Sequence, residues 1–255
     1  MSKIEQEAIE ILVAEVDADL RAASDPERAA AEQRYLKSPL AFLGTGVPQV
    51  RGTVRTLGRA HPFLPRSTVL ALVDALWDAP IHERRLAAIE VMAVYHAVLE
   101  PDDMAVVEGL CREAGTWALV DPLADTIAGQ LIIRWPEAVE TLDRWVRDPE
   151  MWVRRAGLLA LLPSVRRGPD IFARFAGYAD LLLDEREFFI RKAIGWVLRE
   201  VGKRDPESVF VWLAARTDRA SGVTVREAVK YLTTAQREAI LSAHHERHVV
   251  TEETS

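Results

Sequence analysis

Apolar residues recur at spacings of three and four along almost the whole chain, which is the periodicity of amphipathic helices. The segment LVDALWDAPIHERRLAAIEVMAVY carries two such faces, broken at Pro80, with apolar positions at Leu72, Leu76, Leu86, Ile89 and Met92. Most other prolines stand where helices are expected to end, and the strict alternation of strands is absent. The pattern therefore predicts an all-α fold.

Four segments share a basic residue, one or two small residues and then an apolar helical face: HERRLAAIEVM, WVRRAGLLALL, FIRKAIGWVL and TVREAVKYL. Their basic anchors are Arg85, Arg155, Lys192 and Arg226, at intervals of 70, 37 and 34 residues. A period of roughly 35–47 residues with two helices per unit is typical of HEAT-like repeats, which stack into an α-α superhelix with a concave face. We expect one HEAT-like solenoid domain over 1–243 and a polar, flexible tail over 244–255.

Composition narrows the class of protein without identifying a partner. The chain is 49% hydrophobic and 28% charged, the balance of a folded globular protein. Its one cysteine, Cys111, excludes an internal disulfide framework and is expected to be a buried apolar residue. No apolar run is long enough to cross a bilayer, so a cytoplasmic protein is expected. The net charge of −7 weakly disfavours nucleic acid, although a basic groove can exist on an acidic protein.

The residues with the most distinctive chemistry are aromatic and charged. Trp117 and Asp121 are four apart and share one helix face, while Trp196 and Arg155 belong to later repeats that a solenoid could align with them. Tryptophan faces and a carboxylate suit a ligand that is cationic or becomes so in its transition state, such as the sugar in N-glycosidic cleavage. On spacing alone, a Trp–Asp pair is more often a core anchor with a cap or salt bridge.

Five segments, in order, resemble the AlkD-like family of DNA alkylation repair glycosylases, which is built from HEAT-like repeats. They lie between about Arg34 and about Leu232 and read RYLKSPLAFLGTGVP, LWDAPIHERRLAAIEVM, TWALVDPLA, WVRRAGLLAL and FFIRKAIGWVLRE. The resemblance implies a monofunctional glycosylase that removes N3- and N7-alkylated purines from duplex DNA without a deep base pocket. It implies no metal or organic cofactor, no membrane and no obligatory protein partner, so a monomer is expected.

The resemblance also assigns roles to residues. Asp121 would be the catalytic carboxylate, with Trp117 and Trp196 forming an aromatic cleft and Arg155 clamping the DNA backbone beside the lesion. The expected DNA-binding residues are Tyr35, Arg199, Arg154, Lys192 and Arg51. The chain departs from the family pattern in two segments: Ala118 replaces a common acidic residue, and Gly46 with Val47 replaces polar residues after Phe-Leu-Gly.

Several weaker signals have simpler explanations. Arg51, Arg55 and Arg59 form a basic stripe that is either a solvated helix face or a groove wall. His244, His245 and His248 have no fixed carboxylate or third ligand nearby, so a metal site is not expected. The other tryptophans are expected in the core: Trp77, Trp135, Trp145, Trp152 and Trp212. Two other functions stay open: a non-catalytic protein that binds damaged or branched DNA, and a protein–protein scaffold.

Overall fold

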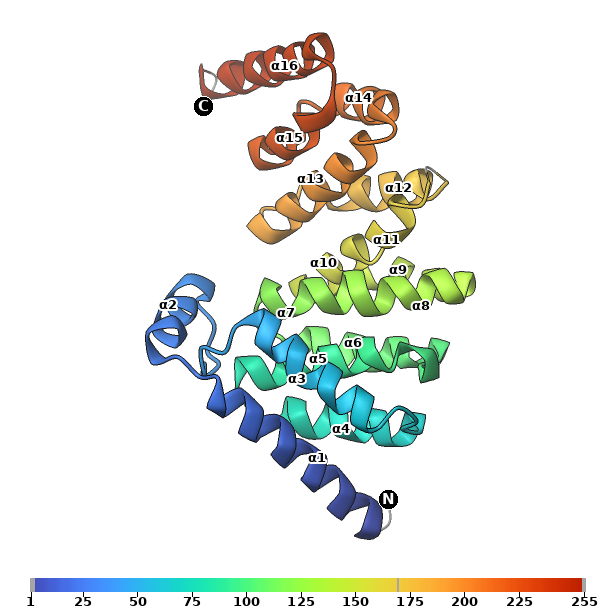
Figure 1. Ribbon diagram of the computed structural model, residues 1–255. Helices are drawn as coiled ribbons and strands as arrows, with labels where there is room; N and C mark the ends of the chain where they lie inside the picture. Colours follow the sequence, from blue (N-terminus) through green and yellow to red (C-terminus); the bar gives the residue numbers. More distant parts are fainter. Residues whose placement is uncertain (1–2, 169, 254–255) are drawn as a thin grey trace. The chain divides into compact units, whose positions relative to one another are not determined.

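The computed structural model describes residues 3–168 and 170–253, with side chains as far as Glu246. The all-α prediction is confirmed, because the described residues form helices and turns and no strand (Figure 1). The one extended contact among them is an isolated bridge between Ala41 and Ile81. No described helix is long and apolar enough to span a bilayer.

The chain divides into two compact units, 1–123 and 124–255. The helices of the first unit are α1 (Lys3–Ala22), α2 (Pro26–Leu36), α3 (Val47–Ala60), α4 (Arg66–Asp78), α5 (His82–Val94), α6 (Met104–Glu113) and α7 (Trp117–Pro122). Helix α5 packs against both α3 and α4. The predicted apolar faces form this unit's core: Leu72, Leu76 and Met92 are fully buried, and Leu86 and Ile89 nearly so. Pro80 lies between α4 and α5, as the sequence predicts.

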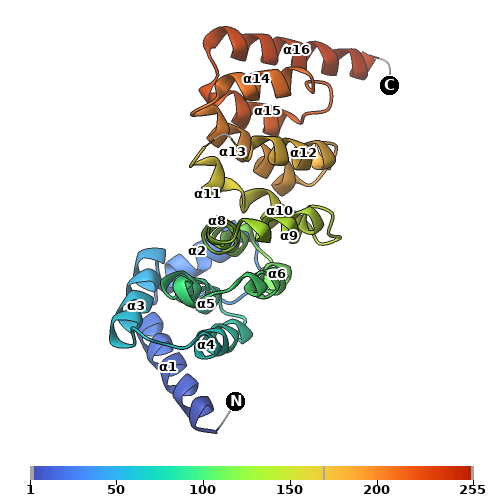
Figure 2. The ribbon, with the colours of Figure 1, turned by 90° about the vertical axis from the view of Figure 1, so that its right-hand side faces the viewer.

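The second unit contains α8 (Gly129–Arg134), α9 (Glu140–Trp145), α10 (Met151–Leu159), α11 (Leu162–Val165), α12 (Phe172–Leu182), α13 (Phe188–Gly202), α14 (Pro206–Ala214), α15 (Gly222–Ala228) and α16 (Thr234–Glu253). Figures 1 and 2 show α13, α15 and α16 as successive layers of this unit. Helices α13 and α15 touch at Gly195, where an added Cβ would lie 2.8 Å from Cβ of Glu227 and 3.0 Å from the Thr224 carbonyl oxygen.

Ion pairs and hydrogen bonds between neighbouring helices recur at similar sequence separations in both units. Arg51 pairs with Glu90, 39 residues away, and Arg66 with Asp103, 37 residues away. In the second unit the separations are 31 for Arg154 and Glu185, 36 for Arg216 and Asp180, 35 for Arg219 and Asp184, and 28 for Arg199 and Glu227. Four of these six separations lie between 35 and 39 residues, within the predicted period, and the other two are shorter. The concave face itself stays a prediction.

The four basic anchors all lie in the second turn of their helices. Arg85 is the fourth residue of α5, and Arg155, Lys192 and Arg226 are each the fifth residue of α10, α13 and α15. Their surroundings differ: Arg155 is buried, Arg85 half-buried, and Lys192 and Arg226 exposed. The shared pattern therefore fixes a helical register rather than a common chemical role.

The expected boundary at 243/244 falls inside α16, which continues unbroken to Glu253. Residues 254–255 lie outside the described residues, so a flexible tail stays a prediction, as does a single domain over 1–243. Among the tryptophans expected in the core, Trp77, Trp145 and Trp212 are buried. The prediction is wrong for Trp135 and Trp152, which are only half-buried; Arg134 lies over the ring of Trp135, and Phe189 packs against the ring of Trp152.

Candidate functional site

The first unit brings together three of the predicted site residues. Trp117 is the first residue of α7 and Asp121 the fifth, so both side chains leave the same face of the helix. The rings of Tyr35 and Trp117 meet edge to face, with centroids 6.2 Å apart and planes at 88°. Tyr35 is 73% exposed, whereas Trp117 and Asp121 are half-buried. A solvent-facing aromatic corner therefore stands one helical turn from a carboxylate.

The backbone around Asp121 is unusual. Helix α7 includes Pro122, and a π-helical segment, Leu123–Ala128, follows before α8 begins at Gly129. Proline has no N–H to donate, so its place in the helix interrupts the regular hydrogen-bond ladder. Such π segments are often found at functional sites. Thr116 caps the other end of α7, where its Oγ1 accepts the Ala118 N–H at 3.3 Å. The helix is therefore capped at its start with alanine at position 118.

A buried carboxylate fixes the segment that follows Tyr35. Glu83 is 1% exposed, and its Oε1 accepts the Gly44 N–H at 2.6 Å. The Leu43 N–H is shared between both carboxylate oxygens, at 3.0 and 2.9 Å. Gly44 has a φ of +79°, and a Cβ there would lie 1.9 Å from the Asp25 carbonyl oxygen, so only glycine fits. The helix that carries Tyr35 is thus joined to α5 through a rigid connection.

Gly46 lies close to the ends of two flexible polar side chains. Gly46 is the N-cap of α3, and a Cβ at this position would lie 2.5 Å from Gln49 Oε1 and 2.8 Å from Arg28 Nη1. Glycine therefore leaves room for the Arg28 guanidinium beside the start of α3. On α3 itself, Arg51 is exposed and its Nε donates to Glu90 at 2.8 Å.

In the second unit, the exposed face of α13 carries aromatic and cationic side chains in turn. Phe188, Lys192, Trp196, Arg199 and Lys203 are separated by four, four, three and four residues, which is one helix face. Lys192 and Lys203 are exposed, and Trp196 and Arg199 are half-buried. Trp196 thus has a cation one turn away on each side. An aromatic ring between cations is the chemistry of a nucleic-acid contact.

Residues 16–232 match the family model described as DNA alkylation repair enzyme. The chain belongs to this family. No curated protein matches its sequence. A solved structure described as a predicted DNA alkylation repair enzyme from Enterococcus faecalis is similar, with 21% identity, coverage of 83% of this chain and 97% of the other, and a TM-score of 0.75.

Two structures from Streptococcus mutans are also similar in fold. AlkD2 is 14% identical in sequence, and the match covers 74% of this chain and 91% of the AlkD2 chain, with a TM-score of 0.59. The protein named smu.31 is 14% identical, with coverages of 73% and 93% and a TM-score of 0.58. At these identities the structures support the all-α fold of a DNA alkylation repair enzyme and nothing finer.

The predicted basic residues of this family member have specific partners. Arg199 Nη1 donates to Glu227 at 2.5 Å, and the guanidinium of Arg154 pairs with Glu185 at 2.7 Å. Arg155 is 2% exposed, and its Nη1 donates to the Phe189 carbonyl oxygen at 2.5 Å. Arg155 is therefore fixed against the first turn of α13, and a backbone clamp at this residue stays a prediction. Among the described residues, no histidine, cysteine or carboxylate group is arranged to hold a metal.

Two carboxylates that organise the α13 face were not predicted from the sequence. Glu227 on α15 accepts from both Arg199 and Lys230, and Glu200 accepts from Lys203 at 2.7 Å. Burial acts to raise the pKa of Glu227, but the hydrogen bond from Lys230 and the charge of Arg199 outweigh it and hold that pKa below its ordinary value. Glu227 is thus an ionised carboxylate shared by two cations. Only the contact between α13 and α15 reveals it.

Proposed function

We propose that this DNA alkylation repair enzyme is a monofunctional glycosylase, which hydrolyses the N-glycosidic bond of cationic N3- and N7-alkylated purines in duplex DNA. One observation carries the proposal: Trp117 and Asp121 share a face of α7, and Tyr35 stands edge-on to Trp117 at an exposed position. Roles for Trp196 and Arg155 in the same reaction rest on the sequence resemblance.

The charge of the substrate explains why so few groups are needed. In an N3- or N7-alkylated purine the base is already cationic, so it leaves with the bonding electron pair as a neutral molecule. No acid has to protonate it, and no deep pocket has to extract it. The sugar carbon gains positive charge as the bond to the base breaks, and a nearby anion stabilises that charge.

Asp121 is the residue proposed to supply this anion. Its carboxylate stabilises the oxocarbenium-like sugar and accepts a proton from the water whose oxygen forms the new bond to the sugar carbon. The products are the free alkylpurine and an abasic site. The π faces of Trp117 and Tyr35 attract the cationic base and sugar, at up to about 2 kcal/mol for a desolvated contact. The reaction as written consumes water only.

The test is release of free base from duplex DNA containing N7-methylguanine. Asp121→Asn removes the charge and keeps the shape, so we expect release to fall on the order of 10²-fold or more while DNA binding persists. Asp125→Asn is the matched control, because Asp125 lies one turn further on and is engaged by Arg166 at 2.7 Å. It should stay within about twofold of wild type, since a surface ion pair contributes little.

The other results identify the alternatives. Tight DNA binding without release from N7-methylguanine or N3-methyladenine DNA would indicate a non-catalytic protein that binds damaged or branched DNA. Neither binding nor release would indicate a protein–protein scaffold. Equal losses in Asp121→Asn and Asp125→Asn would contradict the role given to Asp121.

A further inference from the structure

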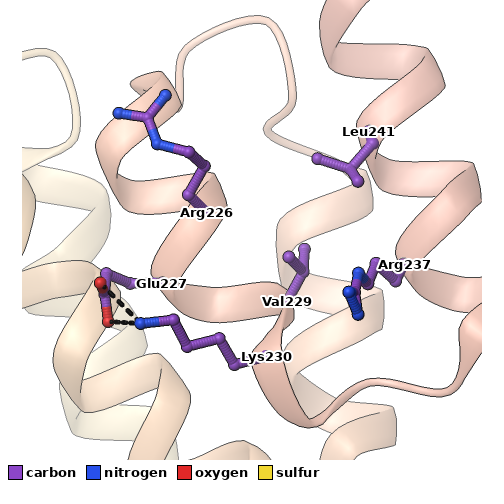
Figure 3. Close-up of a pocket in the computed structure, with 6 residues that line it drawn as sticks. All are labelled: Arg226, Glu227, Val229, Lys230, Arg237 and Leu241. Carbon is purple, nitrogen blue, oxygen red and sulfur yellow. Dashed lines mark hydrogen bonds and ion pairs between the residues drawn. The ribbon is translucent and has the colours of Figure 1, made fainter.

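A surface pocket of about 640 Å³ lies where α15 and the following 3-10 turn (Val229–Tyr231) meet α16. Figure 3 shows Arg226 and Lys230 on one side of this pocket and Arg237 with Leu241 on the other, with Val229 between them. Val229 is buried, and Arg226, Lys230 and Arg237 are exposed. The lining is therefore cationic around an apolar floor.

The single carboxylate of the lining is already engaged. Glu227 accepts from Lys230 Nζ at 2.8 Å to each oxygen and from Arg199 Nη1 at 2.5 Å. The negative charge of Glu227 is thus offset by two cations. The charges of Arg226 and Arg237 therefore make the net charge of the pocket lining positive. The chain as a whole has a net charge of −7, so the charge of this pocket is opposite to that of the chain. Such a site attracts an anion.

Glu227 also connects the pocket to the aromatic–cationic face of α13. It lies between Arg199, which follows Trp196 by three residues on that face, and Lys230 in the pocket. Lys203, at the end of the same face, lies 5.5 Å from the ring of Tyr231, which directly follows Lys230. A DNA strand bound along the α13 face would therefore lie next to Arg226 and Arg237.

We propose that this pocket binds the phosphodiester backbone of DNA. The size of the pocket favours a length of backbone over a single small anion, because 640 Å³ is much more than one phosphate group fills. The alternating lining suits the same ligand, since cations pair with phosphates and apolar atoms pack against sugars. This inference rests on the proposed DNA-binding function and extends it to residues that the family resemblance did not single out.

The test uses the full chain and undamaged duplexes of increasing length, with affinity measured by fluorescence anisotropy as a function of salt. The variant is Arg226→Gln with Arg237→Gln. The matched control is Arg21→Gln with Arg112→Gln, exposed arginines that pair with a carboxylate four residues away on their own helices. Each phosphate contact contributes about 0.9 to the slope of log Kobs against log salt.

We expect the pocket variant to lower that slope by roughly 1 to 2 on long duplexes and the control to leave it unchanged. Base release under single-turnover conditions at saturating enzyme should be unaffected, which separates this site from Asp121.

Three results would overturn the proposal. If the pocket variant binds DNA as the wild type does, with the same slope of log Kobs against log salt, the pocket is not a DNA-binding site. The glycosylase proposal would be unaffected by that result. Calorimetric binding of inorganic phosphate, lost in the variant without any effect on DNA, would identify a small-anion site instead. No DNA binding by the wild type would refute both this site and the proposed function.

Discussion

Replacing Glu83 tests whether one buried carboxylate holds the connection between α2 and α5. Its oxygens accept the N–H groups of Leu43 and Gly44, at 2.6 to 3.0 Å, in a buried environment. A hydrogen bond to a charged group contributes about 1.5–3 kcal/mol, so Glu83→Ala should lower the free energy of unfolding by about 3–6 kcal/mol. Glu83→Gln keeps one acceptor oxygen and should cost about 1–2 kcal/mol.

The assay combines urea unfolding with hydrogen exchange at the Leu43 and Gly44 amides. Both amides should exchange faster in the two Glu83 variants, and more so in Glu83→Ala. Glu90→Gln is the control on the same helix, because its pairing with exposed Arg51 is a surface interaction worth at most about 1 kcal/mol. If the free energy of unfolding of Glu83→Ala is within about 0.5 kcal/mol of the wild-type value and exchange at both amides is unchanged, Glu83 does not hold this connection.

Two further predictions concern acid stability and the packing under Trp196. Burial lowers the pKa of His82 to about 4, so the unfolded chain binds more protons than the folded one between pH 6.5 and 4. Stability should fall by about 3 kcal/mol as the pH drops through this window, and a His82→Gln variant with an equally steep fall in urea titrations would exclude His82 as the cause. Gly195→Ala should cost about 1–3 kcal/mol in thermal unfolding, because its Cβ would meet Glu227. Gly177→Ala, at an exposed helical position with no atom within 4 Å, should stabilise by up to about 1 kcal/mol, and a loss in both variants would show that packing is not the reason.

The fold was predictable because helix formation and burial are local in sequence. The spacing of Leu72, Leu76, Leu86, Ile89 and Met92 predicts two amphipathic helices, and these five residues are the core of α4 and α5. The common face of Trp117 and Asp121 follows from the same rule. Trp135 was a wrong prediction, because an apolar position at a helix end can be covered by an arginine instead of the core.

The organisation of the candidate site was less predictable, because it depends on which helices become neighbours. Glu83 stands next to two arginines in HERRLAAIEVM, and nothing local distinguishes it from a solvated charge, yet its partners lie about 40 residues earlier. Glu227 lies in VREAVK and acquires its role from Arg199, 28 residues away. The edge contact between Tyr35 and Trp117 likewise requires α2 to reach the start of α7.

The ion pairs that recur at separations of 28 to 39 residues have a consequence for how the chain folds. Each of them closes a loop of 28 to 39 residues, so the entropy lost on closure is similar for all of them. Folding can then start at any adjacent helix pair and extend one pair at a time, with kinetics set by local contacts. With this arrangement the terminal helices are expected to unfold first. The last helix, α16, carries Arg237 of the proposed DNA-binding pocket. A ligand bound there would contact both α15 and α16, and would therefore slow the opening of the C-terminal helix.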